Sequence, residues 1–311
     1  MKFENRPPDE GINAQPEHLG REAVWLILGA IGCIILLVVL IDVGTRWLAP
    51  RLPFALERTL AEHMESEAPA PVADERAANA ALQDLADRLR GPLGMPGDIT
   101  VQVRVDDSEV LNAYATVGGR IVVHRGLLRR LQGEHELAAL LAHEMAHVQH
   151  RHVAASLGRG LAIGLVLTVV SADAGGQAAS VLLEQTGGLL MRGYGRDHER
   201  EADASAMRAA AVLHGHVGGV IGLFDRIASA RAERPGCDAE GEPAPSDEPD
   251  KRSRAVPTWL STHPTDEDRT EAARTWAREN GVPVSGIAPV MPPALLAWVR
   301  AAKAPCRSAQ P

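Results

Sequence analysis

The stretch LAALLAHEMAHVQHRH, residues 137–152, places four of the chain's 12 histidines within ten residues. The pattern is that of a helix. On a wheel of about 100° per residue, His147 falls about 40° from His143. Leu137 and Leu141 lie about 120–160° round from His143. The stretch therefore predicts a helix with an apolar side and a histidine side.

The histidine side of this helix has the spacing of a metal site. Histidines at i and i+4 can present two imidazole nitrogens to one ion, and Glu144, which follows His143, can reach a water molecule on that ion. This H-E-x-x-H pattern is typical of zinc hydrolases, whose third ligand comes from elsewhere in the chain. His150 lies about 10 Å along the helix from His143, too far to share its ion. The pattern leaves His150 and His152 unexplained, and a polar helix face that happens to carry histidine is the alternative interpretation.

The composition bounds the class of protein. A chain of 311 residues can form one large domain or two small ones. With 45% hydrophobic but only 3% aromatic residues, the core must be aliphatic and rich in alanine. The net charge of −8 argues against a nucleic-acid partner. The three cysteines, Cys33, Cys237 and Cys306, are too scattered to form a zinc site of their own.

One segment is apolar enough to cross a membrane. Residues 23–44 carry no charge before Asp42, and a bilayer needs about 20 apolar residues. The 22 residues before this run are net acidic and no A-x-A site follows it, which argues against a cleaved signal peptide or a mitochondrial transit peptide. We interpret the run as a signal anchor in contact with membrane lipid. A buried core helix is the alternative.

The rest of the chain divides by composition. Alternating valines predict a strand at 99–105, and the segments 111–117 and 120–124 flank Gly118-Gly119, which predicts a hairpin. The apolar run at 161–170 is too short to span a bilayer and is expected to be a core or interfacial helix. The expected organisation is a polar tail at 1–22, the anchor at 23–44, a juxtamembrane linker at 45–75, one domain at 76–303 with a mobile loop at 233–256, and a C-terminal tail at 304–311.

A third ligand is offered by RDHEREADASAMRAAAVL, residues 196–213. On a helix, Glu199 and Asp203 fall about 40° apart, on the same side as the small apolar residues, whereas Glu201 points toward solvent. Burying two carboxylates without a partner would cost several kcal/mol, so a cation is implied. An arginine partner is the alternative to a metal, and His198 is a weaker ligand candidate.

Four motifs carry a family resemblance. NAYATVGGRIVVHRGLL, ELAALLAHEMAHVQHRH, RDHEREAD and LSTHPTDEDR occur in this order over about residues 76–280. Together they resemble the family-48 zinc metallopeptidases, which include the CAAX prenyl proteases, HtpX and BepA-like peptidases. The resemblance implies a gluzincin-type α+β domain that is mainly helical, with a small β-sheet, preceded here by one transmembrane helix.

The resemblance also implies roles for residues. Glu199 would be the third ligand, beside His143 and His147, of one Zn²⁺ per chain. Asp203 would support a ligand histidine from outside the coordination sphere. Glu144 would act as the general base that accepts a proton from the metal-activated water.

Three further positions remain open between alternatives. In relatives, a histidine at the position of His263 approaches the metal as a fourth ligand or as an oxyanion stabiliser; the alternative is a helix N-terminal residue before Pro264. Arg269 could contact substrate or a carboxylate, but a surface arginine is the preferred interpretation. An edge strand would align an extended substrate through its backbone, unless it is an ordinary core strand. The residues of that strand are Asn112, Ala113 and Tyr114.

The sequence thus predicts a membrane-anchored zinc metalloendopeptidase that acts on misfolded or membrane-associated proteins. A non-proteolytic assembly factor or chaperone with the same fold is the alternative, and prenyl-protein processing is disfavoured because that branch has several membrane spans. A Cys237–Cys306 disulfide, as opposed to two unrelated surface cysteines, would suit an oxidising compartment. We therefore expect a single-pass protein of the bacterial inner membrane with a periplasmic catalytic domain. No pattern predicts the oligomeric state.

Overall fold

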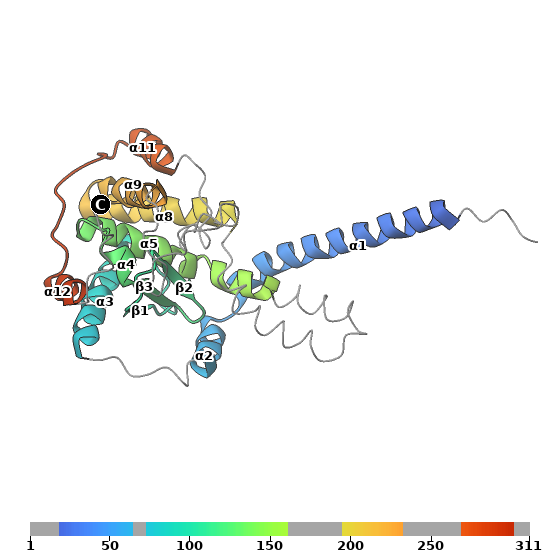
Figure 1. Cartoon of the computed structure of the whole chain (residues 1–311), viewed down its shortest axis with the longest axis horizontal. Coiled ribbons are helices and arrows are strands. Elements are labelled where there is room, and N and C mark those ends of the chain that lie inside the picture. Colours follow the sequence, from blue (N-terminus) through green and yellow to red (C-terminus); the bar gives the residue numbers. More distant parts are fainter. Residues whose placement is uncertain (1–18, 65–72, 161–194, 233–268, 302–311) are drawn as a thin grey trace, which may run out of the picture. The chain divides into compact units, whose positions relative to one another are not determined.

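The computed structural model describes residues 19–64, 73–160, 195–232 and 269–301. These residues form a mainly helical structure with one small three-stranded sheet (Figure 1), which confirms the predicted fold class. The loop predicted at 233–256, the apolar run at 161–170, His263, Cys237 and Cys306 lie outside the described residues.

The chain divides into two compact units, and the boundary falls between Gly44 and Thr45. All the described residues of the first unit belong to helix α1 (Leu19–Leu48). Within the described residues it is the one helix long and apolar enough to cross a membrane. Its large apolar side chains are exposed, Trp25 to 68% and Leu26 to 74%, so they are not packed as those of a core helix are.

The sheet belongs to the second unit and has the order β1-β3-β2. Strand β1 (Gln102–Asp106) pairs in parallel with β3 (Arg120–His124), whereas β2 (Ala113–Thr116) pairs antiparallel with β3. The β2–β3 pairing confirms the predicted hairpin. Strand β1 begins three residues later than its valine pattern predicts.

The hairpin turn requires its two glycines. Gly118 and Gly119 both have positive φ, 77° and 75°, a region in which side chains with a Cβ are strained. A Cβ on Gly119 would lie 2.0 Å from the carbonyl oxygen of Thr100. A Cβ on Gly118 would lie 2.6 Å from Cβ of Ala61. The glycine pair therefore fixes both the turn and the close approach of its neighbours.

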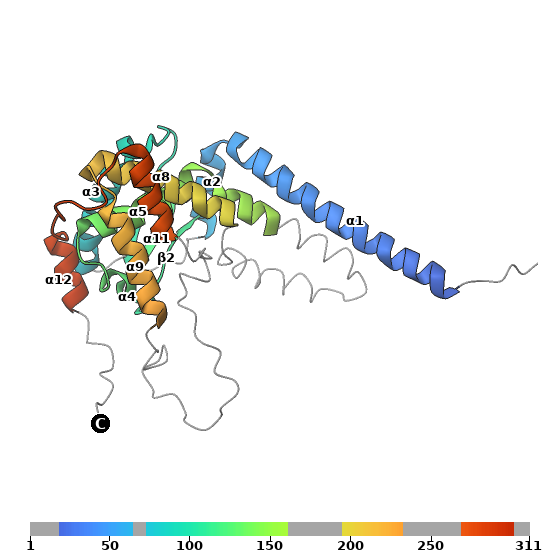
Figure 2. The ribbon, with the colours of Figure 1, turned by 90° about the horizontal axis from the view of Figure 1, so that it is seen from above.

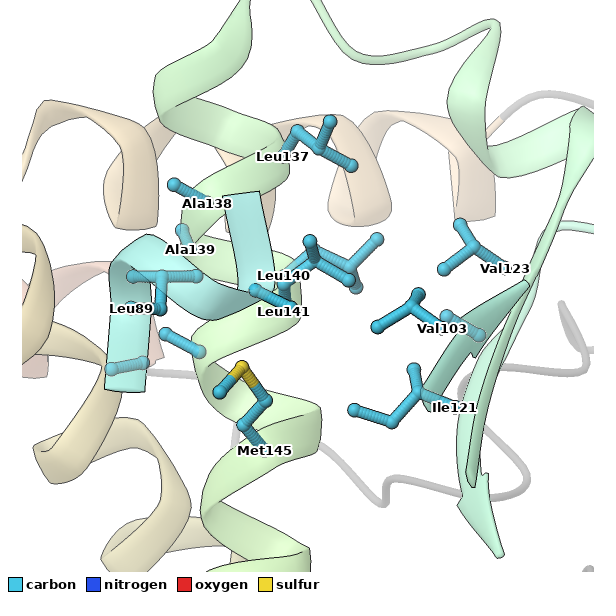
Figure 3. Close-up of a cluster of buried hydrophobic side chains, with 14 of the residues drawn as sticks. Leu89, Val103, Ile121, Val123, Leu137, Ala138, Ala139, Leu140, Leu141 and Met145 are labelled. Atoms are coloured by element: carbon cyan, nitrogen blue, oxygen red, sulfur yellow. The ribbon is translucent and has the colours of Figure 1, made fainter. Parts of the chain in front are cut away.

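Helix α5 (Glu134–Gln149) is the central element of this unit, since every residue from Glu136 to Val148 is buried. Its leucines point toward apolar side chains of the sheet (Figure 3), and each fully buried leucine contributes about 1.5–3 kcal/mol. Leu137, Leu140 and Leu141 of α5 and Val103, Ile121 and Val123 of the sheet belong to one buried apolar cluster. Because α5 has no solvent-facing side over this length, its histidines and glutamates are buried along with its leucines.

Further helices surround α5. It packs against α3 (Ala73–Leu93), α8 (Arg196–His214) and α9 (Gly218–Ala232), and α11 (Arg269–Asn280) lies beside α9 (Figure 2). The remaining elements are a 3-10 helix at Ala49–Arg51, α2 (Phe54–Met64), α4 (Arg125–Leu128), α12 (Pro293–Ala301) and a helical stretch at 152–160.

Helix α2 was not anticipated from the sequence. Its Phe54 and Ala61 are buried, and the guanidinium of Arg120 donates to the carbonyl oxygen of Ala61 at 2.7 Å. These contacts hold α2 against the hairpin.

Candidate metal centre

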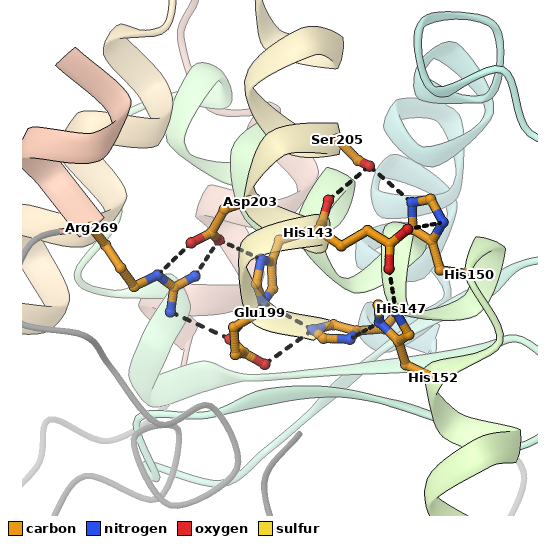
Figure 4. Close-up of polar contacts among 9 residues, drawn as sticks. His143, His147, His150, His152, Glu199, Asp203, Ser205 and Arg269 are labelled. Atoms are coloured by element: carbon orange, nitrogen blue, oxygen red, sulfur yellow. Dashed lines mark hydrogen bonds and ion pairs between the residues drawn. The ribbon is translucent and has the colours of Figure 1, made fainter. Parts of the chain in front are cut away.

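The packing of α8 on α5 brings the three predicted ligands together. His143 and His147 come from adjacent turns of α5, and Glu199 comes from the first turn of α8 (Figure 4). All three side chains are buried, and one nitrogen or oxygen atom of each lies within 4.8 Å of the others. Within the residues that the structure describes, this is the group of histidine, cysteine and carboxylate side chains arranged to hold a metal ion.

The distances among these atoms fit a metal ion. The Nε2 atoms of His143 and His147 are 3.1 Å apart. The Glu199 carboxylate lies 3.5 Å from Nε2 of His143 and 3.4 Å from Nε2 of His147. A tetrahedral ion with bonds of about 2.0–2.1 Å separates its ligand atoms by about 3.3 Å. Two imidazole nitrogens and one carboxylate are also donors that zinc and related transition metals accept.

The local charges favour a cation as well. Burial by itself lowers the pKa of His143, but hydrogen bonds to the Asp203 and Glu199 carboxylates outweigh it and raise this pKa to about 9. Nδ1 of His143 lies 2.9 Å from Asp203, so the ring's other nitrogen is the one directed at Glu199 and His147. The negative potential that favours a proton on this ring equally favours a bound metal ion.

Arg269, at the start of α11, is part of this centre. Its Nε donates to Asp203 at 2.7 Å, a second guanidinium nitrogen donates to the other oxygen of Asp203, and Nη1 lies 3.5 Å from Glu199. The group also lies over the ring of Phe224, 4.3 Å from its centroid. The preference for a surface arginine is therefore wrong, since Arg269 is only 8% exposed.

The buried carboxylates have an arginine partner, as the alternative interpretation predicts, and they also lie in a group that could hold a metal ion. Burial raises the pKa of Asp203, but Arg269 and His143 more than offset this, so the net pKa is lowered. Asp203 and Glu199 carry two negative charges against the one positive charge of the guanidinium. A cation between the histidines would complete the neutralisation.

His147, the second histidine of this set, has a different partner. Nδ1 of His147 lies 2.9 Å from Nδ1 of His152, whose Nε2 lies 3.1 Å from the Glu201 carboxylate. His198, the weaker ligand candidate, stacks on His152 with ring centroids 4.0 Å apart. His150 also approaches Glu201, at 3.3 Å. Glu201 is half-exposed, as a solvent-facing residue would be, yet it pairs with both histidines that the sequence left unexplained.

The other predicted site residues are placed as follows. Glu144 is buried on α5, directly after His143. Strand β2 lies at the end of the sheet order and packs against α5. Of the predicted substrate-binding residues, Asn112 and Ala113 are buried and Tyr114 is half-buried, with its ring 5.7 Å from that of His124.

Fold and site together define a metallopeptidase. A buried His-His-Glu set, with a glutamate between the histidines on a central helix, is the arrangement of that class. The chain belongs to peptidase family M48, whose model matches residues 76–277. This match confirms the resemblance of the four motifs.

Relatives of this chain include proteases of bacteria and mitochondria. A putative beta-barrel assembly-enhancing protease of Vibrio cholerae is 29% identical over 180 residues, which are 54% of this chain and 33% of the relative. The mitochondrial metalloendopeptidase OMA1 of Schizosaccharomyces pombe is 30% identical over 165 residues, 52% of this chain and 48% of the relative. The beta-barrel assembly-enhancing protease of Escherichia coli is 27% identical over 187 residues, 56% of this chain and 34% of the relative. The chain thus spans about a third to a half of the length of these relatives.

Proposed function

We propose that this chain is a membrane-anchored zinc metalloendopeptidase that hydrolyses peptide bonds of misfolded or membrane-associated proteins. The observation that carries the proposal is the buried set of His143, His147 and Glu199, with Glu144 on the same helix as the two histidines. The protease names of the relatives support polypeptides as the substrate class.

The chemistry follows from these residues. A Zn²⁺ ion held by His143, His147 and Glu199 would lower the pKa of a bound water toward about 7 and polarise the scissile carbonyl. Glu144 accepts the proton of the attacking water on its carboxylate and passes it to the leaving amine. Because these side chains are buried, bulk water is excluded and each charge acts more strongly than it would in solvent.

Substrate alignment is proposed for the segment Asn112, Ala113 and Tyr114. Strand β2 ends the sheet order and packs on the helix that carries the histidines, so an extended peptide running along it would pass close to the centre. For His263 the two proposed roles remain a ligand that closes the site and a donor to the oxyanion.

The membrane anchor is proposed for residues 23–44 of α1. The length of this helix and its exposed apolar side chains support a single lipid-embedded span. We place the span in the bacterial inner membrane, with the catalytic domain in the periplasm and the N-terminal tail in the cytoplasm. Two measurements test this placement: protease protection in inverted inner-membrane vesicles, where a periplasmic domain lies inside, and mass mapping of Cys237 and Cys306 without reductant. Digestion of the domain in these vesicles, together with two free thiols, would contradict the placement.

The activity is tested with the purified full-length chain in detergent micelles. Unfolded casein is incubated with the protein alone, with a chelator, and with Zn²⁺ restored after chelation. We expect cleavage that the chelator abolishes and zinc restores, and no cleavage by Glu144→Gln. Casein binding without cleavage by the zinc-loaded protein would instead favour an assembly factor. Cleavage that survives both the chelator and Glu144→Gln would overturn the proposal.

A further inference from the structure

The outer nitrogen of His147 meets another imidazole. His143 presents its Nδ1 to a carboxylate, that of Asp203, at 2.9 Å. His147 instead presents its Nδ1 to Nδ1 of His152, at 2.9 Å. Both rings are buried, and His152 is only 3% exposed.

The hydrogen-bond directions along this path are fixed by chemistry. If His147 binds metal through Nε2, its one proton lies on Nδ1, which must donate. Nδ1 of His152 must then accept, so the proton of His152 lies on Nε2. That nitrogen is 3.1 Å from the Glu201 carboxylate, which can only accept while it is ionised. The order of donation is therefore His147 to His152 to Glu201.

The backbone is built to make this contact. On a continuous helix, His152 would fall about 140° round from His147 and could not reach it. Helix α5 ends at Gln149, and Arg151 adopts a left-handed conformation with φ of 62° before helical structure resumes at 152. This conformation is rare for a residue with a side chain and is held by tertiary contacts.

Arg151 receives those contacts from α2 and the residues before it. Its guanidinium donates to the carbonyl oxygen of Leu52 at 3.0 Å and lies 2.8 Å from the Glu57 carboxylate. It also lies 5.3 Å from the ring centroid of Phe54. These contacts hold the turn that brings the ring of His152 to Nδ1 of His147. The ring of His152 also stacks on the ring of His198, with centroids 4.0 Å apart.

We propose that His152, supported by Glu201, is a positioning residue for the metal ligand His147. Its Nδ1 holds the His147 ring in the tautomer and orientation that direct Nε2 at the metal. This inference rests on the proposed metal site. Outer partners of this kind, when removed, weaken metal affinity or activity by about 10–100-fold.

The test measures zinc affinity of the full-length chain by competition with a chelator, independently of activity. His152→Leu replaces the imidazole with an apolar side chain of similar size and so removes the hydrogen-bond acceptor. We expect this variant to bind zinc about 10–100-fold more weakly. His152→Asn places an amide oxygen near the position of Nδ1, and we expect it to recover part of the affinity. A purely packing role predicts the reverse order, with Leu tolerated and Asn not.

The matched control is His150→Leu. His150 lies two residues from His152 and approaches the same Glu201 carboxylate. It also contacts Ser205 and stacks on the His152 ring with centroids 5.5 Å apart, so His150→Leu removes a neighbouring ring while the contact between His147 and His152 stays. We expect this variant to retain the affinity of the unaltered protein. Glu201→Leu removes the end of the path from a half-exposed position, so it carries the test if His152→Leu fails to fold; we expect weaker binding than in His150→Leu.

The outcomes separate this inference from the proposed function. Unaltered protein that binds no zinc would remove both. Unaltered protein that binds zinc, with equal affinity in His152→Leu, His152→Asn and His150→Leu, would leave the metal site in place and overturn the role of His152. If only the Glu201 comparison is measurable, equal affinity in Glu201→Leu and His150→Leu overturns it.

Discussion

The two histidines of α5 are held by contrasting surroundings. His143 contacts the Asp203 carboxylate, which accepts hydrogen bonds from Arg269, and all three side chains are buried. His147 rests on a second imidazole, that of His152, and the path ends at the half-exposed Glu201. One support is ionic and interior; the other is neutral where it touches the ligand and reaches solvent at its far end.

Because of this difference, we expect substitutions at the two supports to have different effects on folding stability and on metal binding. Removing one member of a buried ion pair leaves an uncompensated charge, which is strongly destabilising. Removing a half-exposed carboxylate leaves a site that water can solvate, so little stability is lost. Substitutions of Asp203 or Arg269 should therefore affect both folding and metal binding. A substitution of Glu201 should affect metal binding with little effect on folding.

The largest effect is expected at a residue that belongs to neither support. Glu144→Gln removes the proton acceptor and should reduce peptide hydrolysis by about 10²–10⁴-fold, the range of general-base catalysis. Zinc content and the free energy of unfolding should match the unaltered protein, because both supports are intact. Loss of zinc in this variant would show that Glu144 helps to hold the metal, which would contradict the assignment of Glu144 to catalysis alone.

The next effect is on stability. Arg269→Gln leaves the Asp203 and Glu199 carboxylates without their cation and should lower the free energy of unfolding of the metal-free protein by about 3–5 kcal/mol. The control is Glu201→Gln, for which a half-exposed pair predicts a change of about 1 kcal/mol or less. Denaturant titration after chelation measures both. Equal changes in the free energy of unfolding for Arg269→Gln and Glu201→Gln would contradict the claim that the Asp203 support matters more for stability than the Glu201 support.

The smallest effect compares the two supports through the metal. Charge-assisted hydrogen bonds are roughly twice as strong as neutral ones. Asp203→Asn should therefore weaken zinc binding toward the upper end of the 10–100-fold range, roughly 100-fold, and His152→Leu toward roughly 10-fold. Chelator competition resolves this ranking, and the reverse order would mean that the imidazole is the stronger support.

Local patterns were enough to predict much of this arrangement. The spacing of His143 and His147 and the pairing of Glu199 with Asp203 each lie within one helix, where 3.6 residues per turn decide which side chains share a face. The hairpin was predicted for a similar reason, since Gly118 and Gly119 adopt a conformation that few other residues accept.

The contacts that sequence reasoning missed depend on tertiary structure. Arg269 is separated from Asp203 by 66 positions, and nothing local marks an arginine as buried. On a continuous helix over 137–152, as the sequence predicts, His152 would fall about 140° round from His147. The left-handed turn at Arg151 reverses that, and its cause lies in the contacts to Leu52 and Glu57, about a hundred residues earlier. A histidine five positions after the second histidine of H-E-x-x-H is the sequence signal that could have raised the question.

The most direct test of the account is the metal content of one pair of variants. Glu199 and Asp197 are carboxylates in the first turn of the same helix, but Glu199 is buried between the histidines and Asp197 is exposed. Elemental analysis should find about one zinc per chain in the unaltered protein and in Asp197→Ala, and almost none in Glu199→Ala. Equal zinc in the two variants would contradict the claim that His143, His147 and Glu199 hold a metal ion together.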